Sequence, residues 1–591
     1  MKRSKPMAAV AGIALLALAA CGGGGDDGDS AGPDEFKDTT PPVEKIPDAE
    51  GPAPEIDGAQ EGGTITVMHP DPDDGPDSLD PTPMWSVTDN GIMQALVFRS
   101  LTTFRYNPET GGMELVPDLA TDLGTPNEDF TEWTFTIKDN VKWEDGTPVT
   151  ADEVAFGLKR SMDSEALPGP GNVYSNGFFL GGDKYAGPYK SGDNFEGISV
   201  SGQDVIIKMS KPFSEMDFWG TFAAMSPVKP GKASEPPGYG LDPLATGPYK
   251  VKSFTPNQEI VLERNDQWDP ATDPARHQFV DEFVLKFDQN PETTDATMIS
   301  DNEESQTMIN TILSGSKFQE ASAALGDQVR VDPQTCTSFL AMQYQGPNAI
   351  DDINIRRAIA FAYDYENVWA AAGEIPGTTR VMGNAYLPKG MLGYDESLEP
   401  SPGETVEYNP EKAKEYLAKA GIEPGEYELR WAYDDTTQEG KDAMEQVRNG
   451  YEEAGFKTKP FPYSGGSLYD VWTDPDNNIH KKLNLQGTAW CQDWPSAATF
   501  LPPLFQTDEF YNTGEFSEKT IDDMIAAVPE MPLEEQPGAW EEIDKTLNQE
   551  YYPNVNLGYY NNLQAYGGAI GNYTYDTVQG YPNLRDVYVT Q

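Results

Sequence analysis

The sequence predicts an α/β protein made of more than one lobe, each built on a mixed β-sheet. The chain has 591 residues, which is more than one hydrophobic core normally organises. Hydrophobic residues make up 38% of it, with 25 Phe, 28 Tyr and 11 Trp, so large cores can form. Strand-like and helix-like segments follow each other irregularly, without the strict strand–helix–strand order of a purely parallel sheet, and this favours mixed sheets.

The strand predictions rest on runs of apolar, aromatic and β-branched residues. Thr64–Met68 is a short run of this kind that opens the folded part of the chain. Trp133, Phe135 and Ile137 alternate with polar residues, which is typical of a strand with one buried face. Further strands are expected as a pair within residues 248–263 and as one run within residues 279–287.

The helix predictions rest mainly on capping signals. Thr150 and Glu153 have the spacing of a capping box, and apolar residues then recur on one helical face. Asn409 and Pro410 begin another helix, and Gly421 ends it. The buried faces of these two helices are expected to carry Val154, Leu158, Met162, Ala413, Tyr416, Leu417 and Ala420. Other helices are expected at residues 352–372, 438–454 and 534–550.

The chain is strongly acidic, with 41 basic and 97 acidic residues and a formal net charge of −56. Nucleic acids and anionic membrane surfaces repel a protein of this charge, so neither is expected as a partner. The charge does not by itself indicate a cationic ligand, because an acidic surface more often serves solubility or adaptation to salt.

The N-terminus has the features of an exported lipoprotein. Residues 1–20 begin with basic side chains and continue as an apolar run too short to span a bilayer, which is typical of a signal peptide. The run ends in Leu-Ala-Ala before Cys21, which resembles the bacterial lipobox. Residues 21–62 are rich in Gly, Asp, Pro and Glu and predict a flexible tether. We therefore expect an extracytoplasmic protein that is anchored to the bacterial cell membrane through a lipid on Cys21. A plain signal peptide beside a chance Cys is the alternative.

Two other cysteines, Cys336 and Cys491, remain once Cys21 is set aside. In an exported protein, two such cysteines most simply form one disulfide bond. A pair of buried free thiols is the alternative that the residues alone leave open.

The sequence has no recognisable catalytic or cofactor motif. It contains no G-x-S-x-G elbow, no H-E-x-x-H metal motif and no G-x-x-x-x-G-K-[ST] phosphate loop. Three scattered His residues do not form a zinc site. Carboxylate pairs suited to glycoside hydrolysis stay open, because 97 acidic residues guarantee chance pairs. We therefore expect a binding protein rather than an enzyme, without metal or cofactor, and an extracellular hydrolase is the alternative.

Seven runs carry a resemblance to a known family. The most specific run is Trp133 to Val154, in which a strand and the turn Asp-Gly-Thr-Pro-Val-Thr-Ala lead into the capped helix. The others are Ser78–Pro81, Leu96–Leu101, Pro117–Ala120, Thr246–Tyr249 with Leu262–Asn265, Ile355–Ala360, and Asn409–Ala413 with Ala420–Gly421. In this order they resemble family 5 of the ABC-importer solute-binding proteins, the oligopeptide and dipeptide binders. The resemblance covers about residues 62–591.

The resemblance implies a periplasmic-binding-protein-like fold with two main lobes, an inserted third lobe and hinge closure on the ligand. Carried over to this chain, lobe I comprises residues 63–96, 216–335 and 561–591, lobe II residues 97–215 and lobe III residues 336–560. The ligand is expected between lobes I and III. The resemblance also implies a monomer that delivers its ligand to an ABC permease and its ATPase subunits.

The run from Trp490 to Asp493 is expected to hold the ligand. In oligopeptide binders, a similar W-C-x-D run supplies a Trp that lines a side-chain pocket, a Cys that pairs with an earlier Cys, and an Asp that meets the α-ammonium group of the peptide. The resemblance implies these roles for Trp490, Cys491 and Asp493. Cys336, which lies in a similar C-T run, is then the partner of Cys491.

Other interpretations of the site residues stay open. Asp493 can be an ordinary cap or turn residue, and Trp490 can be a core residue. Tyr559 and Tyr560 are further pocket candidates near the end of lobe III. Gly487 stands where tripeptide-selecting relatives place an Arg that receives the peptide C-terminus, so the ligand's length is open. The expected ligand is a peptide, and the alternative is another solute, such as an oligosaccharide, bound by the same fold.

Overall fold

The computed structural model describes residues 42–71, 75–401 and 403–591. The predicted signal peptide and Cys21 lie outside the described residues. Within the described part of the chain, no helix is both long and apolar enough to cross a bilayer. The lobe boundaries given above stay predictions, and the parts are therefore named below by their sheets.

The largest sheet has nine strands in the order β17-β13-β18-β12-β2-β11-β10-β9, with β14 paired to β18. β2 runs parallel to β11 and β12, whereas β10 is antiparallel to β9 and β11, so the sheet is mixed as the sequence predicts. Ile65 and Val67 of β2 are fully buried. The strands are β2 Thr64–Met68, β9 Tyr249–Thr255, β10 Glu259–Arg264, β11 Glu282–Lys286, β12 Met308–Asn310, β13 Val329–Met342, β14 Arg380–Val381, β17 Leu485–Cys491 and β18 Asn554–Tyr566.

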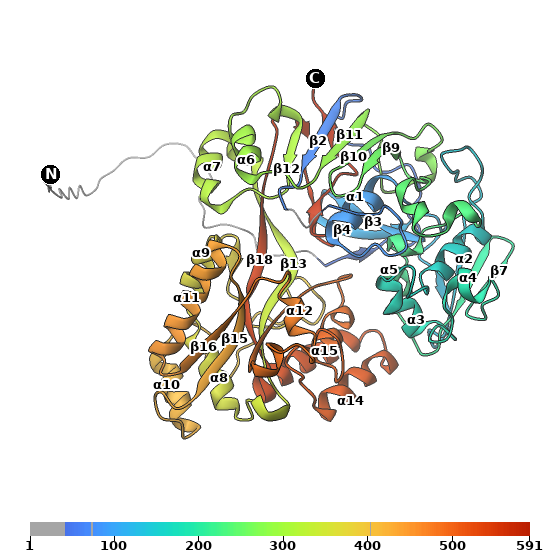
Figure 1. Cartoon of the computed structure of the whole chain (residues 1–591). Helices are drawn as coiled ribbons and strands as arrows, with labels where there is room; N and C mark the ends of the chain where they lie inside the picture. Colours follow the sequence, from blue (N-terminus) through green and yellow to red (C-terminus); the bar gives the residue numbers. More distant parts are fainter. Residues whose placement is uncertain (1–41, 72–74, 402) are drawn as a thin grey trace, which may run out of the picture. The chain divides into compact units, whose positions relative to one another are not determined.

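Two long strands, β13 and β18, run through both the upper and the lower part of the structure in Figure 1. They pair antiparallel to each other over most of their length. Their register shifts between Pro333 and Thr337 and again between Thr337 and Phe339. Because a shift of register interrupts the ladder of hydrogen bonds, the pairing between β13 and β18 is irregular near Thr337.

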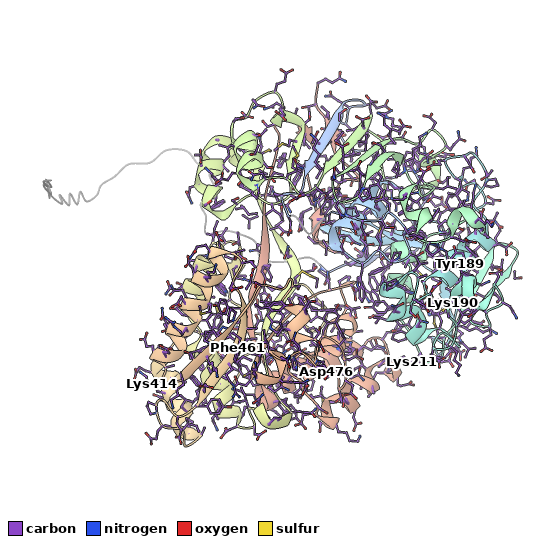
Figure 2. The ribbon with its side chains drawn as sticks, in the orientation of Figure 1. Tyr189, Lys190, Lys211, Lys414, Phe461 and Asp476 are labelled. Atoms are coloured by element: carbon purple, nitrogen blue, oxygen red, sulfur yellow. A yellow bond between two sulfur atoms is a disulfide. The ribbon has the colours of Figure 1, made fainter. Side chains whose placement is uncertain are left out.

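A four-stranded sheet, in the order β5-β6-β8-β7, forms a second part with helix α2. Thr150 and Glu153 form the predicted capping box at the start of α2, and Val154, Leu158 and Met162 are all fully buried. Both predictions for this region are confirmed. The elements are β5 Thr125–Pro126, β6 Glu132–Thr136, α2 Ala151–Arg160, β7 Ile198–Ser201 and β8 Asp204–Lys208. Figure 2 marks Tyr189 and Lys190 on this part.

The third part holds the parallel pair β15-β16 and several helices, and Figure 2 marks Phe461 and Lys414 on it. Asn409 caps α10 as predicted, and Gly421 follows the helix with a φ of +74°, which suits glycine. The expected helix at 352–372 is instead two helices, because Tyr363 takes an extended conformation and ends the first. The elements are α8 Ile353–Ala362, α9 Tyr365–Ala371, α10 Pro410–Lys419, β15 Glu428–Asp434, α11 Gln438–Glu453, β16 Lys457–Tyr463 and α15 Gln536–Thr546.

The second half of the predicted tether, residues 42–62, packs against the folded part of the chain. Strand β1 (Glu44–Lys45) pairs in parallel with β4 (Gly112–Pro117), and Lys45 forms an ion pair with Asp217 at 2.6 Å. Ala53 is buried. The segment docks because its main chain adds a strand to a free sheet edge and its few large apolar side chains, among them Val43 and Ile46, pack against the core.

Four fully buried charges lie where the first two parts meet. Arg99 donates to Asp118 at 2.6 Å, and Arg276 donates to the other carboxylate oxygen of Asp118 at 2.9 Å. Arg276 also donates to Asp273 at 3.2 Å. Two positive and two negative charges thus balance each other out of contact with water, which buried charges require.

Candidate functional site

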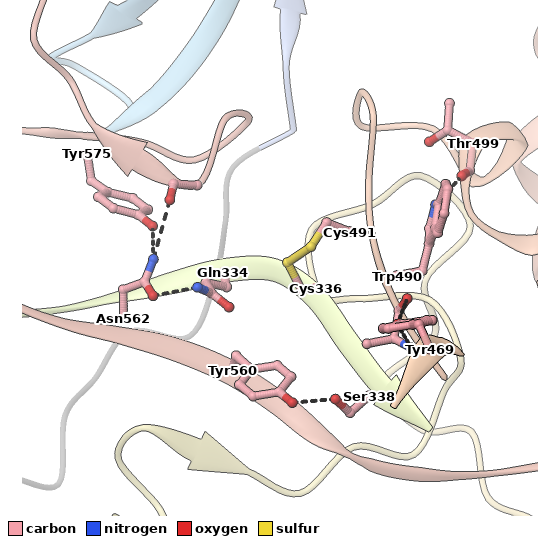
Figure 3. The surroundings of a disulfide bond; sticks show 12 residues. Gln334, Cys336, Ser338, Tyr469, Trp490, Cys491, Thr499, Tyr560, Asn562 and Tyr575 are labelled. Carbon is pink, nitrogen blue, oxygen red and sulfur yellow. Dashed lines mark hydrogen bonds between the residues drawn. A yellow bond between two sulfur atoms is a disulfide. The ribbon is translucent and has the colours of Figure 1, made fainter. Parts of the chain in front are cut away.

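The segment from Trp490 to Asp493 follows the outer strand of the nine-stranded sheet. β17 pairs antiparallel with β13, so that Cys336 lies opposite Cys491. The two cysteines form a disulfide bond, as Figure 3 shows, and the predicted pairing is confirmed. The bond closes a separation of 155 residues along the chain and fixes β17 at the point where its last residue precedes Asp493.

Asp493 receives hydrogen bonds from two distant parts of the chain. The indole N–H of Trp85 donates to its Oδ1 at 2.8 Å, and the hydroxyl of Tyr174 donates to its Oδ2. The Asp493 side chain is half-buried, so the carboxylate can still accept a further donor. Burial raises the pKa of this carboxyl to about 6, and the hydrogen bonds from Tyr174 and Trp85 limit the rise.

Sequence reasoning missed Trp85 and Tyr174. They lie 408 and 319 residues from Asp493 along the chain. No local motif marks either of them. Asp493 lies in a bend, the next helix is capped by Ser496, and the two recorded partners of the Asp493 carboxylate are side chains from other parts of the chain.

Trp490 is half-buried beside the carboxylate. Its indole N–H donates to the carbonyl of Thr499 at 2.7 Å (Figure 3). Its ring packs edge-on against the ring of Trp85, with the ring centroids 6.3 Å apart. It is tilted against the ring of Tyr511, with the centroids 4.6 Å apart. The pocket role of Trp490 stays a prediction, and the position of its ring next to Trp85 is compatible with it.

The two tyrosines of β18 differ in their surroundings. Tyr559 is buried, and its hydroxyl donates to the carbonyls of Ala385 and Leu387 at 3.0 and 3.1 Å. Tyr560 is half-buried, and its hydroxyl pairs with that of Ser338 as Figure 3 shows. The guanidinium of Arg380 lies 3.2 Å from the centre of the Tyr560 ring. Tyr560 therefore has the more accessible side chain, and both pocket roles stay predictions.

Gly487 lies under the indole ring of Trp472. A Cβ atom at Gly487 would fall 2.4 Å from this ring, closer than any real contact. Any side chain at position 487 would therefore require the ring of Trp472 to move.

Two cavities lie near this segment. Tyr174 and Trp494 line one of about 420 Å³, together with Lys211, which Figure 2 labels. Trp472 and Phe510 line another of about 430 Å³. Both volumes lie in the lower part of the range that is usual for small-ligand pockets. In the described part of the chain, no group of three or more His, Cys, Asp or Glu side chains could hold a metal ion.

Comparison with curated proteins finds relatives over most of the chain. The periplasmic oligopeptide-binding protein OppA of Salmonella typhimurium is 24% identical over 480 residues, which cover 78% of this chain and 82% of OppA. A dipeptide-binding protein of Lactococcus lactis subsp. cremoris is 24% identical over 455 residues, covering 72% of this chain and 77% of the relative.

A solved structure and a family model agree with these relatives. Clavulanic acid biosynthesis oligopeptide binding protein 2 has a TM-score of 0.81 at 23% identity, over 92% of this chain and 99% of that one, which shows the shared fold. Residues 114–512 match the model described as bacterial extracellular solute-binding proteins, family 5 Middle. The chain therefore belongs to family 5 of the bacterial extracellular solute-binding proteins.

Proposed function

We propose that this chain is the extracytoplasmic binding component of an ABC importer, and that its ligand is a peptide whose free N-terminus is held by Asp493. The observation that carries the proposal is the Asp493 carboxylate. It lies two residues beyond the end of an outer strand, is fixed by Trp85 and Tyr174, and remains partly accessible. The names of the relatives, which refer to oligopeptide and dipeptide binding, support the choice of a peptide.

The chemistry of a peptide suits this arrangement. A peptide can bind as an added strand through its main chain, and its charged N-terminus then needs an anion at one end. A carboxylate that is already partly out of water gains more from an ammonium group than an exposed one does. Trp490 and Trp85 offer aromatic surface to the side chains nearest that end. The proposal assigns no catalytic step to the chain.

Native mass spectrometry of the purified protein tests the proposed ligand class. We expect mass increments that correspond to peptides and disappear when the protein is denatured, because an enclosed cleft retains ligand from the producing cell. Increments spaced by hexose units would instead support the oligosaccharide alternative and contradict the peptide proposal.

We further propose that the protein is a monomer anchored to the cell membrane by lipid on Cys21. Cys21→Ser removes the thiol that would carry the lipid and lies outside the folded part that the structure describes. We expect the variant to move from the membrane fraction to the soluble extracytoplasmic fraction when cells are fractionated. An equal amount of variant and wild type in the membrane fraction would refute the anchor.

A further inference from the structure

The outer edge of β17 is where a peptide strand would be added. Among the described strands, β17 is an edge strand of the nine-stranded sheet. It pairs with β13 on one side, and no strand pairs with its other edge. Asp493 follows the strand by two residues. An extended ligand whose ammonium group meets Asp493 can therefore run along this edge towards Gly487.

Tyr469 already occupies part of that edge. The N–H of Ala489 donates to the Tyr469 hydroxyl at 2.8 Å, and the same hydroxyl donates to the carbonyl of Ala489 at 3.1 Å. Both main-chain groups of Ala489 therefore point away from β13. Because alternate residues of a strand point their main-chain groups to the same edge, those of Gly487 and Cys491 also face outward.

The edge beyond Ala489 is closed as well. The hydroxyl of Thr513 donates to the carbonyl of Gly487 at 3.1 Å, and the ring of Trp472 covers Gly487. Tyr469 and Trp472 are the first and last residues of the one-turn helix α12 (Tyr469–Trp472), and their ring centroids are 5.3 Å apart. One short helix thus blocks two successive outward-facing positions of β17.

We propose that Tyr469 ends the strand edge on which the ligand pairs, so that the site selects peptides of two or three residues. The proposal rests on the proposed function and adds the ligand's length to it. Ala489 is four positions before Asp493, which corresponds to about 13 Å of extended chain. A tripeptide spans about 10 Å, whereas a pentapeptide spans about 17 Å and meets the Tyr469 hydroxyl.

Tyr469→Ala tests this proposal because it removes the side chain that occupies the edge at Ala489. We expect wild-type protein to bind trialanine at least tenfold more tightly than pentaalanine in isothermal titration calorimetry. In the variant, the freed N–H and C=O of Ala489 can pair with the longer ligand. The advantage of trialanine should then shrink at least tenfold, through tighter binding of pentaalanine, while trialanine binds as before and shows that the variant is folded.

Tyr463→Ala is the matched control. Tyr463 lies on β16, and its hydroxyl donates to the Asp470 carboxylate at 3.4 Å. Its recorded hydrogen bond is therefore not to the main chain of β17. This variant should keep the wild-type preference.

The possible results separate the two proposals. Equal binding of trialanine and pentaalanine by wild-type protein would overturn the length limit and leave the peptide function standing. An unchanged preference in Tyr469→Ala would show that Tyr469 does not set the limit. Failure of wild-type protein to bind any free peptide would remove the proposed function, and the length limit with it.

Discussion

Asp493→Asn should weaken the binding of a free dipeptide or tripeptide by two to nearly four orders of magnitude. Asn keeps the shape of the side chain, and it can still accept from Trp85 and pair with the Tyr174 hydroxyl. It removes the negative charge, so the ammonium group of the ligand would be buried without a counter-charge. Loss of such a partner costs about 3–5 kcal/mol. Isothermal titration calorimetry at pH 7 measures the change.

The pH dependence of binding distinguishes the ammonium role from a purely structural one. The peptide ammonium stays protonated below about pH 7, whereas Asp493, with its pKa of about 6, gains a proton as the pH falls through that value. Only the ionised carboxylate attracts the ligand. Affinity for wild-type protein should therefore be highest near pH 7 and fall about tenfold per pH unit well below pH 6, and affinity for Asp493→Asn should not change between about pH 4.5 and 7.

Acetylation of the peptide N-terminus completes a double-mutant cycle. It should weaken binding to wild-type protein about as much as the mutation does and add little further loss in Asp493→Asn, because both changes delete the same interaction. If wild-type protein binds acetylated and free peptides equally well, Asp493 does not bind the peptide ammonium group. Its role is then limited to its contacts with Trp85 and Tyr174.

Asp118→Asn should lower the free energy of unfolding by about 3–5 kcal/mol. Arg99 and Arg276 both donate to the Asp118 carboxylate, and none of the three side chains is exposed. The substitution leaves two buried guanidinium groups with only Asp273 as counter-charge, and an uncompensated buried charge is strongly destabilising. Differential scanning calorimetry should show that the transition of the region around Asp118 moves to lower temperature.

Asp193→Asn provides the control for this prediction. Asp193 pairs with Lys159 at 2.9 Å, but its own side chain is 73% exposed. An exposed pair of this kind contributes at most about 1 kcal/mol. An equally small effect of Asp118→Asn would contradict the prediction. It would mean that Arg99 and Arg276 rearrange or become hydrated in the variant.

The local predictions from the sequence succeeded where short-range signals determine structure. β2 occupies the predicted Thr64–Met68, and the capping box of Thr150 and Glu153 and the cap at Asn409 are present. Each of these depends on residues within one or two turns of each other. The Cys336–Cys491 bond is also as predicted, because these two cysteines are the one pair left once Cys21 is set aside.

Contacts over long distances could not be predicted in the same way. Two runs that carry the family resemblance contain Asp80 and Asp118, whose buried ion pairs with Arg160 and Arg99 no local pattern indicates. The donors to Asp493, and the hydroxyl of Tyr469 against Ala489, join segments that share no periodicity or motif. Such contacts depend on how distant segments pack against each other in the fold. No short stretch of the sequence indicates which distant segments will pack together.

The nine-stranded sheet also sets the order in which the chain can fold. Its interior strand β12 pairs on one side with β2 and on the other with β18, and His69 just after β2 contacts Tyr581 at 3.0 Å, 512 residues later. A ribosome that adds about 5–20 residues per second needs about 25–100 s to make that interval. The first strand of the sheet is thus made long before its last partners exist. Throughout synthesis the nascent chain lacks a finished core here, and it stays accessible to chaperones and to any translocation machinery that requires an unfolded polypeptide.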